Sequence, residues 1–92
     1  MELGSAIKKI RKEKGIQQKK FALLCGISIT AIVQIEGNQS FPHKETMNKI
    51  CNALNITPSF LLFSSLTEED VPIERRPVFH VLKNALSELL SK

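Results

Sequence analysis

The segment 18–37 constrains the fold of this 92-residue chain most, because it predicts two short helices that meet across a very short turn. Apolar residues recur at helical spacing over 21–25, and Gly26 follows where a chain leaving a helix needs a positive φ angle. Ser28 can then cap a second helix over about 29–36, because its hydroxyl accepts from an otherwise unpaired amide of the first turn. Helices joined in this way cross steeply, so the segment predicts a helix-turn-helix unit.

Four further stretches also have the apolar spacing of helices. They are residues 3–14, the stretch around Met47, Ile50 and Cys51 that ends at Leu54, residues 57–62 and residues 78–91. Asn55 suits a helix end because it tolerates the left-handed conformation, and Thr57 with Pro58 suits a helix start. No stretch has the alternating, β-branched pattern of a strand. The sequence therefore predicts an all-α fold of about six helices.

The net charge of +4 is unevenly distributed along the chain. Residues 1–50 hold nine Lys or Arg and four Glu, a balance of +5, whereas residues 51–92 hold four basic and five acidic residues, a balance of −1. Seven of the basic residues lie between Lys8 and Lys20. Such a cluster suits nucleic acid, anionic lipid or simple solubility, so charge alone leaves all three open.

Length and composition disfavour several other classes of protein. A chain of this size buries one small core and has no room for a separate catalytic domain. It has no apolar run of 18 residues and no signal-peptide pattern, which predicts a cytoplasmic protein without a membrane partner. Cys25 and Cys51 are expected to be small buried hydrophobes, and with His43 and His80 they lack the spacing of zinc ligands. We therefore expect no metal, no cofactor and no enzymatic activity.

Three short motifs follow one another along the segment 18–38. They are Gln18-x-x-Phe21-Ala22, Cys25-Gly26-Ile27-Ser28 and Ile35-Glu36-Gly37-Asn38. In this order they resemble the Cro/repressor family of helix-turn-helix proteins, the lambda-repressor-like DNA-binding domains. The resemblance covers roughly residues 3–62. It implies a five-helix domain that binds operator DNA, generally as a dimer, with the second helix of the unit in the major groove.

Carried over residue by residue, the resemblance implies two sets of DNA contacts. The residues implied to read bases are Ile29, Thr30, Val33 and Gln34. The residues implied to hold phosphates are Gln18, Ser28, Asn38, Gln39 and Ser40. Two lysines are added to this phosphate set on their own positions: Lys19, which flanks Gln18, and Lys44, where this chain departs from the family's pattern. Two alternatives stay open: Ile29 and Val33 could belong to the core or to a protein interface, and the lysines could form a solvated face. Glu36 is expected to be structural and to pair with Arg11, because an acidic side chain there cannot help to bind phosphate.

The sequence departs from the family's pattern at two helix starts. Gln17 stands where the family usually has a capping Ser or Thr, which predicts a frayed entry into the helix that starts at Gln18. His43 and Lys44 stand where the family favours a capping Ser and an apolar residue. The start of the helix that ends at Leu54 is therefore left open.

The sequence changes character after the region of resemblance. Residues 1–63 are predicted to form the DNA-binding domain, 64–77 a polar, Pro-punctuated linker and 78–92 a C-terminal amphipathic helix. The apolar side of this helix is predicted to form a dimer interface of Val78, Phe79, Leu82, Leu86 and Leu89. The alternative is that it packs back on the chain's own domain.

These observations predict a sequence-specific regulator that binds double-stranded DNA as a homodimer. It would be a repressor of bacterial or phage type that reads a palindromic operator with the helix 29–36. The alternative is an antitoxin or another interaction module, whose residues 64–92 bind a partner protein while the helix-turn-helix unit autoregulates. A third hypothesis, an enzyme or a metal sensor, has no motif in its support.

Overall fold

The computed structural model describes residues 1–90. Six α-helices and two short 3₁₀ turns make up its regular structure, and none of these residues lies in a strand. The elements are α1 Leu3–Glu13, α2 Gln18–Cys25, α3 Ile29–Glu36, α4 Lys44–Leu54, α5 Pro58–Ser65, the turns η1 Glu68–Asp70 and η2 Ile73–Arg75, and α6 Arg76–Leu90. The predicted all-α class is confirmed.

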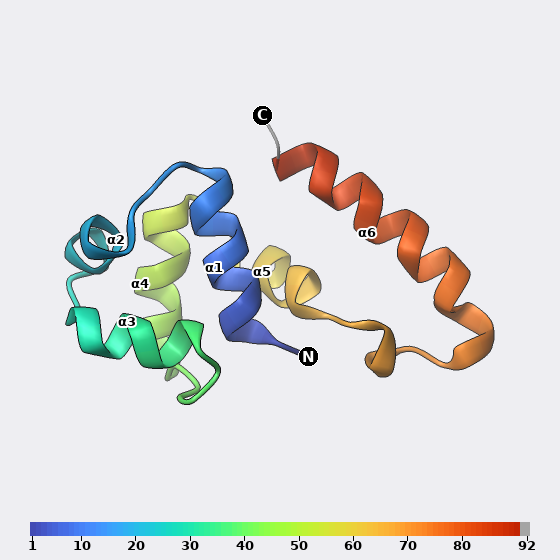
Figure 1. Ribbon diagram of the computed structural model, residues 1–92, viewed down its shortest axis with the longest axis horizontal. Helices are drawn as coiled ribbons and strands as arrows, with labels where there is room; N and C mark the ends of the chain where they lie inside the picture. Colours follow the sequence, from blue (N-terminus) through green and yellow to red (C-terminus); the bar gives the residue numbers. More distant parts are fainter. Residues whose placement is uncertain (91–92) are drawn as a thin grey trace.

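Helices α1–α5 pack together as a bundle, and α6 lies to one side of it (Figure 1). Helix α1 packs against α3 and α5, while α2 packs against α3 and α4. The chain leaves α5, runs outward through η1 and η2 and returns along α6. No single helix within residues 1–90 is long and apolar enough to cross a membrane; α2 and α3 reach that length and composition only together, across a bend of 110°.

The helix ends follow local rules that the sequence carries. The hydroxyls of Ser28 and Thr57 each accept a backbone N–H from the first turn of the following helix at 3.1 Å, so both predicted caps are confirmed. Gly26 and Asn55 end α2 and α4 with positive φ angles of 71° and 57°, also as predicted. After α3 the positive φ, 61°, occurs at Asn38.

Three helix boundaries add to what the sequence indicates. Helix α4 begins at Lys44, which settles the start that the sequence left open. Helix α5 continues to Ser65, so the first two residues of the predicted linker complete its last turn. Helix α6 begins at Arg76, two residues early, because Pro77 then lies in the first turn, where a missing N–H and a fixed φ angle are tolerated.

The core lies where α1–α5 meet. Its buried apolar residues are Leu3, Ala6, Ile7, Ile10, Phe21, Ala22, Cys25, Ile32, Ile35, Ile50, Cys51, Leu54 and Leu61. Cys25 and Cys51 are buried and unbridged, as predicted. Burial raises the pKa of both thiols, and it raises that of Cys25 to about 11 with help from the charge of Glu36. Leu24, expected among the apolar residues of α2, is instead 52% exposed, because this two-turn helix packs on one side only.

The stretch predicted as a linker is held by contacts near both of its ends. The α-amino group of Met1 lies 2.9 Å from a carboxylate oxygen of Asp70, and the N–H of Glu2 donates to the carbonyl of Ser65 at 2.9 Å. Further along, Nε of Arg76 donates to two backbone carbonyls of the η1 region at 2.9 and 3.2 Å. These contacts fix where α6 begins relative to α1 and α5.

Candidate nucleic-acid interface

Helices α2 and α3 form the predicted helix-turn-helix unit. Their axes are bent by 110° across the turn, within the range of such units. The N–H of Ile27 donates to the carbonyl of Ala22 at 3.2 Å and closes the turn after Gly26. Ala22 is buried, and its small side chain lets the two helices approach each other. The cap at Ser28 then starts α3 directly, so α3 leaves the turn at a fixed angle.

Helix α3 has one buried side and one exposed side. Ile32 and Ile35 point into the core with 0% and 4% of their surface exposed. The four residues predicted to read bases, Ile29, Thr30, Val33 and Gln34, are all exposed. Ile29 and Val33 keep 43% and 48% of their surface, so they are not part of this chain's core. The other alternative for these two residues, a protein interface, stays open.

A family model described as a helix-turn-helix domain matches residues 4–63, about two thirds of the chain. The chain belongs to the helix-turn-helix domain family. No curated protein sequence matches it. Helix-turn-helix domains bind DNA, so residues 4–63 are a DNA-binding domain.

Two buried charges connect three helices of the helix-turn-helix domain. The guanidinium of Arg11 on α1 donates from Nε and Nη2 to the two carboxylate oxygens of Glu36 on α3, at 2.7 and 3.0 Å. Its Nη1 donates to the carbonyl of Ile16 at 2.8 Å. Nε2 of Gln18, the first residue of α2, donates to the same carboxylate at 3.1 Å. The predicted structural pairing of Glu36 with Arg11 is confirmed, and it includes Gln18.

The start of α2 combines backbone amides with positive charge. Gln17 is extended and its side chain does not cap the helix, yet α2 is helical from Gln18 onward. Lys19 and Lys20 follow and are both exposed. The first amides of a helix carry a partial positive charge and favour an anion. This end of α2 therefore has the chemistry of a phosphate contact.

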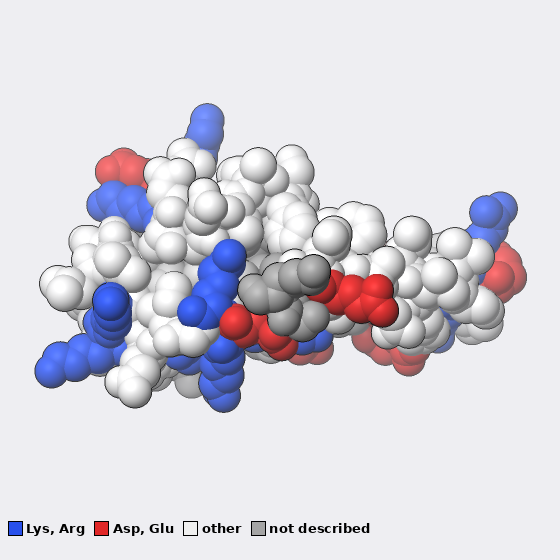
Figure 2. Space-filling model, turned by 90° about the horizontal axis from the view of Figure 1, so that it is seen from above, with Lys and Arg blue, Asp and Glu red and all other residues white. Residues whose placement is uncertain are grey.

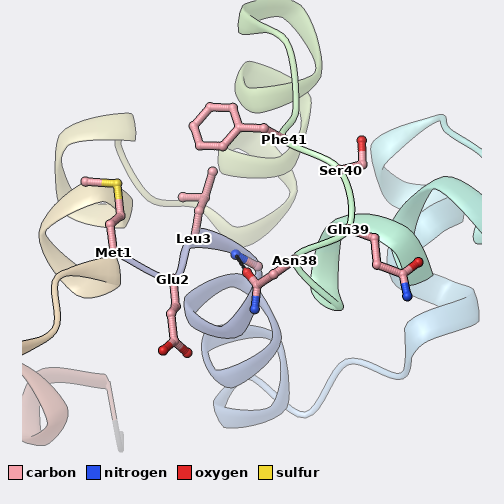
Figure 3. A pocket seen from close by; sticks show the side chains of 8 residues that line it. Met1, Glu2, Leu3, Asn38, Gln39, Ser40 and Phe41 are labelled. Carbon is pink, nitrogen blue, oxygen red and sulfur yellow. Dashed lines mark hydrogen bonds between the residues drawn. The ribbon is translucent and has the colours of Figure 1, made fainter.

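The loop after α3 is tied to the start of α1. Oδ1 of Asn38 accepts the N–H of Gly4 at 2.8 Å, and its Nδ2 donates to the hydroxyl of Ser5 at 3.0 Å. A Cβ atom at Gly4 would lie 2.0 Å from the carbonyl oxygen of Ile35, so only glycine fits there. Figure 3 shows the Asn38 side chain at the first turn of α1 and those of Gln39 and Ser40 pointing away.

The residues predicted to bind phosphate therefore lie in different surroundings. Lys19, Gln39, Ser40 and Lys44 have exposed side chains. Gln18 is half-buried and Ser28 and Asn38 are exposed, but all three already make hydrogen bonds within the chain. The sequence indicated the Arg11–Glu36 pair but gave no sign of the contact between Gly4 and Asn38, which joins residues 34 positions apart.

Fewer residues of the basic cluster over 8–20 lie at the surface than the sequence suggests. Arg11 is only 6% exposed and paired with Glu36, whereas the lysines of this stretch are exposed. Figure 2 shows basic side chains projecting at the end of the molecule built by α2 and α3. Within residues 1–90, no three His, Cys, Asp or Glu side chains are grouped to hold a metal ion.

Proposed function

We propose that the chain is a sequence-specific regulator of transcription that acts in the cytoplasm and reads a palindromic operator as a dimer. The observation that carries the proposal is the exposed side of α3. Ile32 and Ile35 anchor the helix in the core, so Thr30, Val33 and Gln34 project together from a helix of fixed position. A protruding helix of this kind fits the B-DNA major groove.

The exposed side of α3 has both polar and apolar reading groups. The amide of Gln34 can accept from and donate to one adenine edge, and the hydroxyl of Thr30 can donate or accept. Ile29 and Val33 can contact thymine methyl groups. This mixture favours a half-site that contains A·T pairs.

Phosphate contacts would fix the register of α3 in the groove. Nε2 of Gln18 carries two hydrogens, so it can donate one to Glu36 and the other to a phosphate oxygen. Lys19, the amides at the starts of α2 and α3, and Lys44 would add positive charge along the same backbone. Gln39 and Ser40 would donate from the loop. Asn38 would act by holding that loop against α1.

Selection of bound duplexes from a random pool tests the proposal. We expect a palindromic consensus whose half-sites lie about one helical turn, ~34 Å, apart. Gln34→Ala should relax the preference at one base pair and cost about 1–3 kcal/mol on the consensus, with little change on random DNA. Asn48→Ala, at an exposed position of α4, is the matched control. Equal binding of wild type and Gln34→Ala to consensus and random duplexes would contradict the role of Gln34.

Repression would follow from occupancy alone. A dimer that covers two successive major grooves excludes polymerase or another factor from the same DNA, and the chain needs no further activity for this. Reporter expression from a promoter that contains the selected site should fall when the protein is present. A rise in expression would instead indicate activation.

A second candidate function rests on α6. Val78, Leu82 and Leu89 keep 61%, 50% and 72% of their surface exposed, so this helix offers an apolar face to another protein. An antitoxin would use residues 64–92 for its toxin and the helix-turn-helix domain for its own operator. Light scattering of the purified chain separates the two functions, because a chain that binds DNA but stays a monomer at every concentration up to the millimolar range would leave α6 free for a different partner.

A further inference from the structure

Helix α6 has two apolar sides with different surroundings. Phe79 is 9% exposed, and Leu86 is partly buried. Lys83 follows Phe79 by one turn, and its Nζ donates to the carbonyl of Ser64 at 2.5 Å. This side of α6 therefore faces the chain's own α5 and η1. Phe79 and Leu86, both predicted for a dimer interface, are wholly or partly used within the chain.

The other side of α6 has no apolar cover in the described structure. Val78, Leu82, Ala85 and Leu89 are all exposed and recur at spacings of four, three and four residues. An average spacing near 3.5 residues keeps these side chains in one narrow line along the helix, as in the seam of a coiled coil. We call these four residues the outer stripe.

An apolar groove lies beside the first half of the outer stripe. Val78, Phe79 and Leu82 form one wall, and Phe63, Leu66, Val71 and Pro72 form the rest, with Arg75 as the single charged lining residue. Its volume is about 380 Å³. The groove and the outer stripe share Val78 and Leu82, so they form one continuous apolar surface.

We propose that α6 of a second copy packs antiparallel on the outer stripe and that its C-terminal turn covers the groove. This proposal rests on the dimer proposed above and specifies how it forms. With a two-fold axis between residues 83 and 84, Leu82 faces Ala85 of the second copy and Val78 faces Leu89. Each large side chain then meets a smaller one, and the helices can approach closely at Ala85.

A parallel pair would fit the same surface poorly. Ala85 would face Ala85 at the centre of the stripe and leave a gap, while Leu89 would face Leu89. The N-terminal end of the second α6, with its own η2 attached, would lie beside the groove. The antiparallel pair instead brings the second copy's Leu89 beside Val78, at the groove wall, on both sides of the axis.

The exposed area predicts a weak, reversible dimer. Phe63, Val78, Val81, Leu82 and Leu89 are between 39% and 72% exposed, and each can bury roughly 40–70 Å², judged from the area of a fully buried apolar side chain. Since about 65% of a homodimer interface is apolar, the whole interface is about 600–1,100 Å². Stable complexes bury about 1,200–2,000 Å², so we expect an equilibrium between monomer and dimer that palindromic DNA shifts toward the dimer.

Cysteine cross-linking tests the direction of the pair in the full-length chain. Cysteines replace one end residue of the stripe in each of two variants, Val78→Cys and Leu89→Cys. In an antiparallel pair two copies of residue 78 lie about 16 Å apart along the axis, too far for a disulfide, whereas residue 78 of one copy faces residue 89 of the other. We expect oxidation to link an equal mixture of the two variants and neither variant alone. Wild type controls for the two buried native cysteines.

Two results would overturn the proposal. One is efficient self-linking of Val78→Cys alone, which indicates a parallel pair. The other is a monomer by light scattering at every concentration up to the millimolar range, with no link in the mixture. Neither result bears on DNA reading, because Gln34→Ala tests that function on a different helix.

A charge substitution supplies an independent readout. Leu82→Glu should raise the dissociation constant of the dimer by about tenfold or more, because it places a charge at the centre of an apolar interface. Asn84→Glu adds the same charge at an exposed position on another side of α6 and should leave the dissociation constant unchanged. An equal effect of both substitutions would contradict the assignment of the outer stripe.

Discussion

The guanidinium of Arg11 and the carboxylate of Glu36 form two hydrogen bonds, 2.7 and 3.0 Å long, between the first and third helices. Both side chains are almost fully buried, at 7% and 2% exposed. A buried ion pair adds little net stability, because each charge loses its hydration. Removing one partner is costly, since the other charge is then buried and unpaired. In this protein Glu36 also accepts a hydrogen bond from Gln18, so loss of the Arg11–Glu36 pair would also affect the start of α2.

Arg11→Met should destabilise the fold by about 3–5 kcal/mol, because it leaves the Glu36 carboxylate buried without its main partner. The double variant Arg11→Met with Glu36→Met should lose less stability than the single one, since no charge is then left unpaired. Urea denaturation of both variants measures the free energies of unfolding. Lys12→Met, at an exposed neighbouring position, should stay within about 0.5 kcal/mol of wild type. A double variant less stable than Arg11→Met would contradict the prediction, because it would show that Glu36 is not left unpaired when Arg11 is removed.

Gly4→Ala should destabilise the fold by about 1–3 kcal/mol, because the new Cβ would meet the Ile35 carbonyl oxygen and force α1 away from the end of α3. Lys8→Ala, on the exposed side of the same helix, is the control and should have almost no effect. Thermal denaturation compares the two. An unchanged melting temperature for Gly4→Ala would contradict the prediction, because it would mean that α1 can shift without loss of stability.

Ser28→Ala and Thr57→Ala form a matched pair, because each hydroxyl caps a helix with a hydrogen bond of 3.1 Å. Each substitution should cost about 0.5–2 kcal/mol of stability. Only Ser28 lies at the candidate interface, so only Ser28→Ala should also weaken DNA binding under conditions where both variants stay folded. Equal DNA affinities for the two variants would remove Ser28 from the phosphate-binding set.

Stability should fall as the pH rises from about 9 toward 11, the interval between the ordinary thiol pKa of 9.0 and the raised pKa of Cys25. Below this interval the thiol is protonated in both the folded and the unfolded state, so Cys25 makes no pH-dependent contribution to stability. Within it the unfolded chain loses the thiol proton first, which favours unfolding. Denaturation at pH 8 and 10 should show the loss of stability, and Cys25→Ala should reduce it.

A thiol reagent at pH 8 should modify Cys25 and Cys51 only as fast as the fold opens.

Much of the fold can be predicted from the sequence because local chemistry decides it. The caps at Ser28 and Thr57 and the left-handed residues Gly26 and Asn55 lie at helix ends, where the need for a partner or a positive φ is set by neighbours in the chain. The outward position of the α3 residues follows in the same way from helical spacing. The contact of these particular α3 residues with DNA stays a prediction.

The rest depends on contacts between distant residues. Leu24 and Phe79 both belong to apolar helical patterns in the sequence, yet Leu24 is 52% exposed and Phe79 is 9% exposed. Phe79 is buried because it lies beside residues of α1 and α5, which are distant in the sequence. Likewise, helical spacing shows that α6 is amphipathic but not which of its sides its own chain covers. The pairing of Arg11 with Glu36 is predicted, but the burial of Arg11, which the sequence places in the basic cluster, depends on a contact with a residue 25 positions away.

The double attachment of α3 to α1 has a thermodynamic consequence for recognition. Glu36 and Asn38 fix the end of α3 to α1 before any ligand is present. Binding then orders little of the backbone, so the free energy of binding DNA includes no entropy loss from folding this helix. Calorimetry should accordingly show a heat-capacity change that matches the buried apolar interface alone, without the larger change of coupled folding. Because α3 keeps its position, any change of shape on binding would occur in the DNA, which must deform to fit the helix.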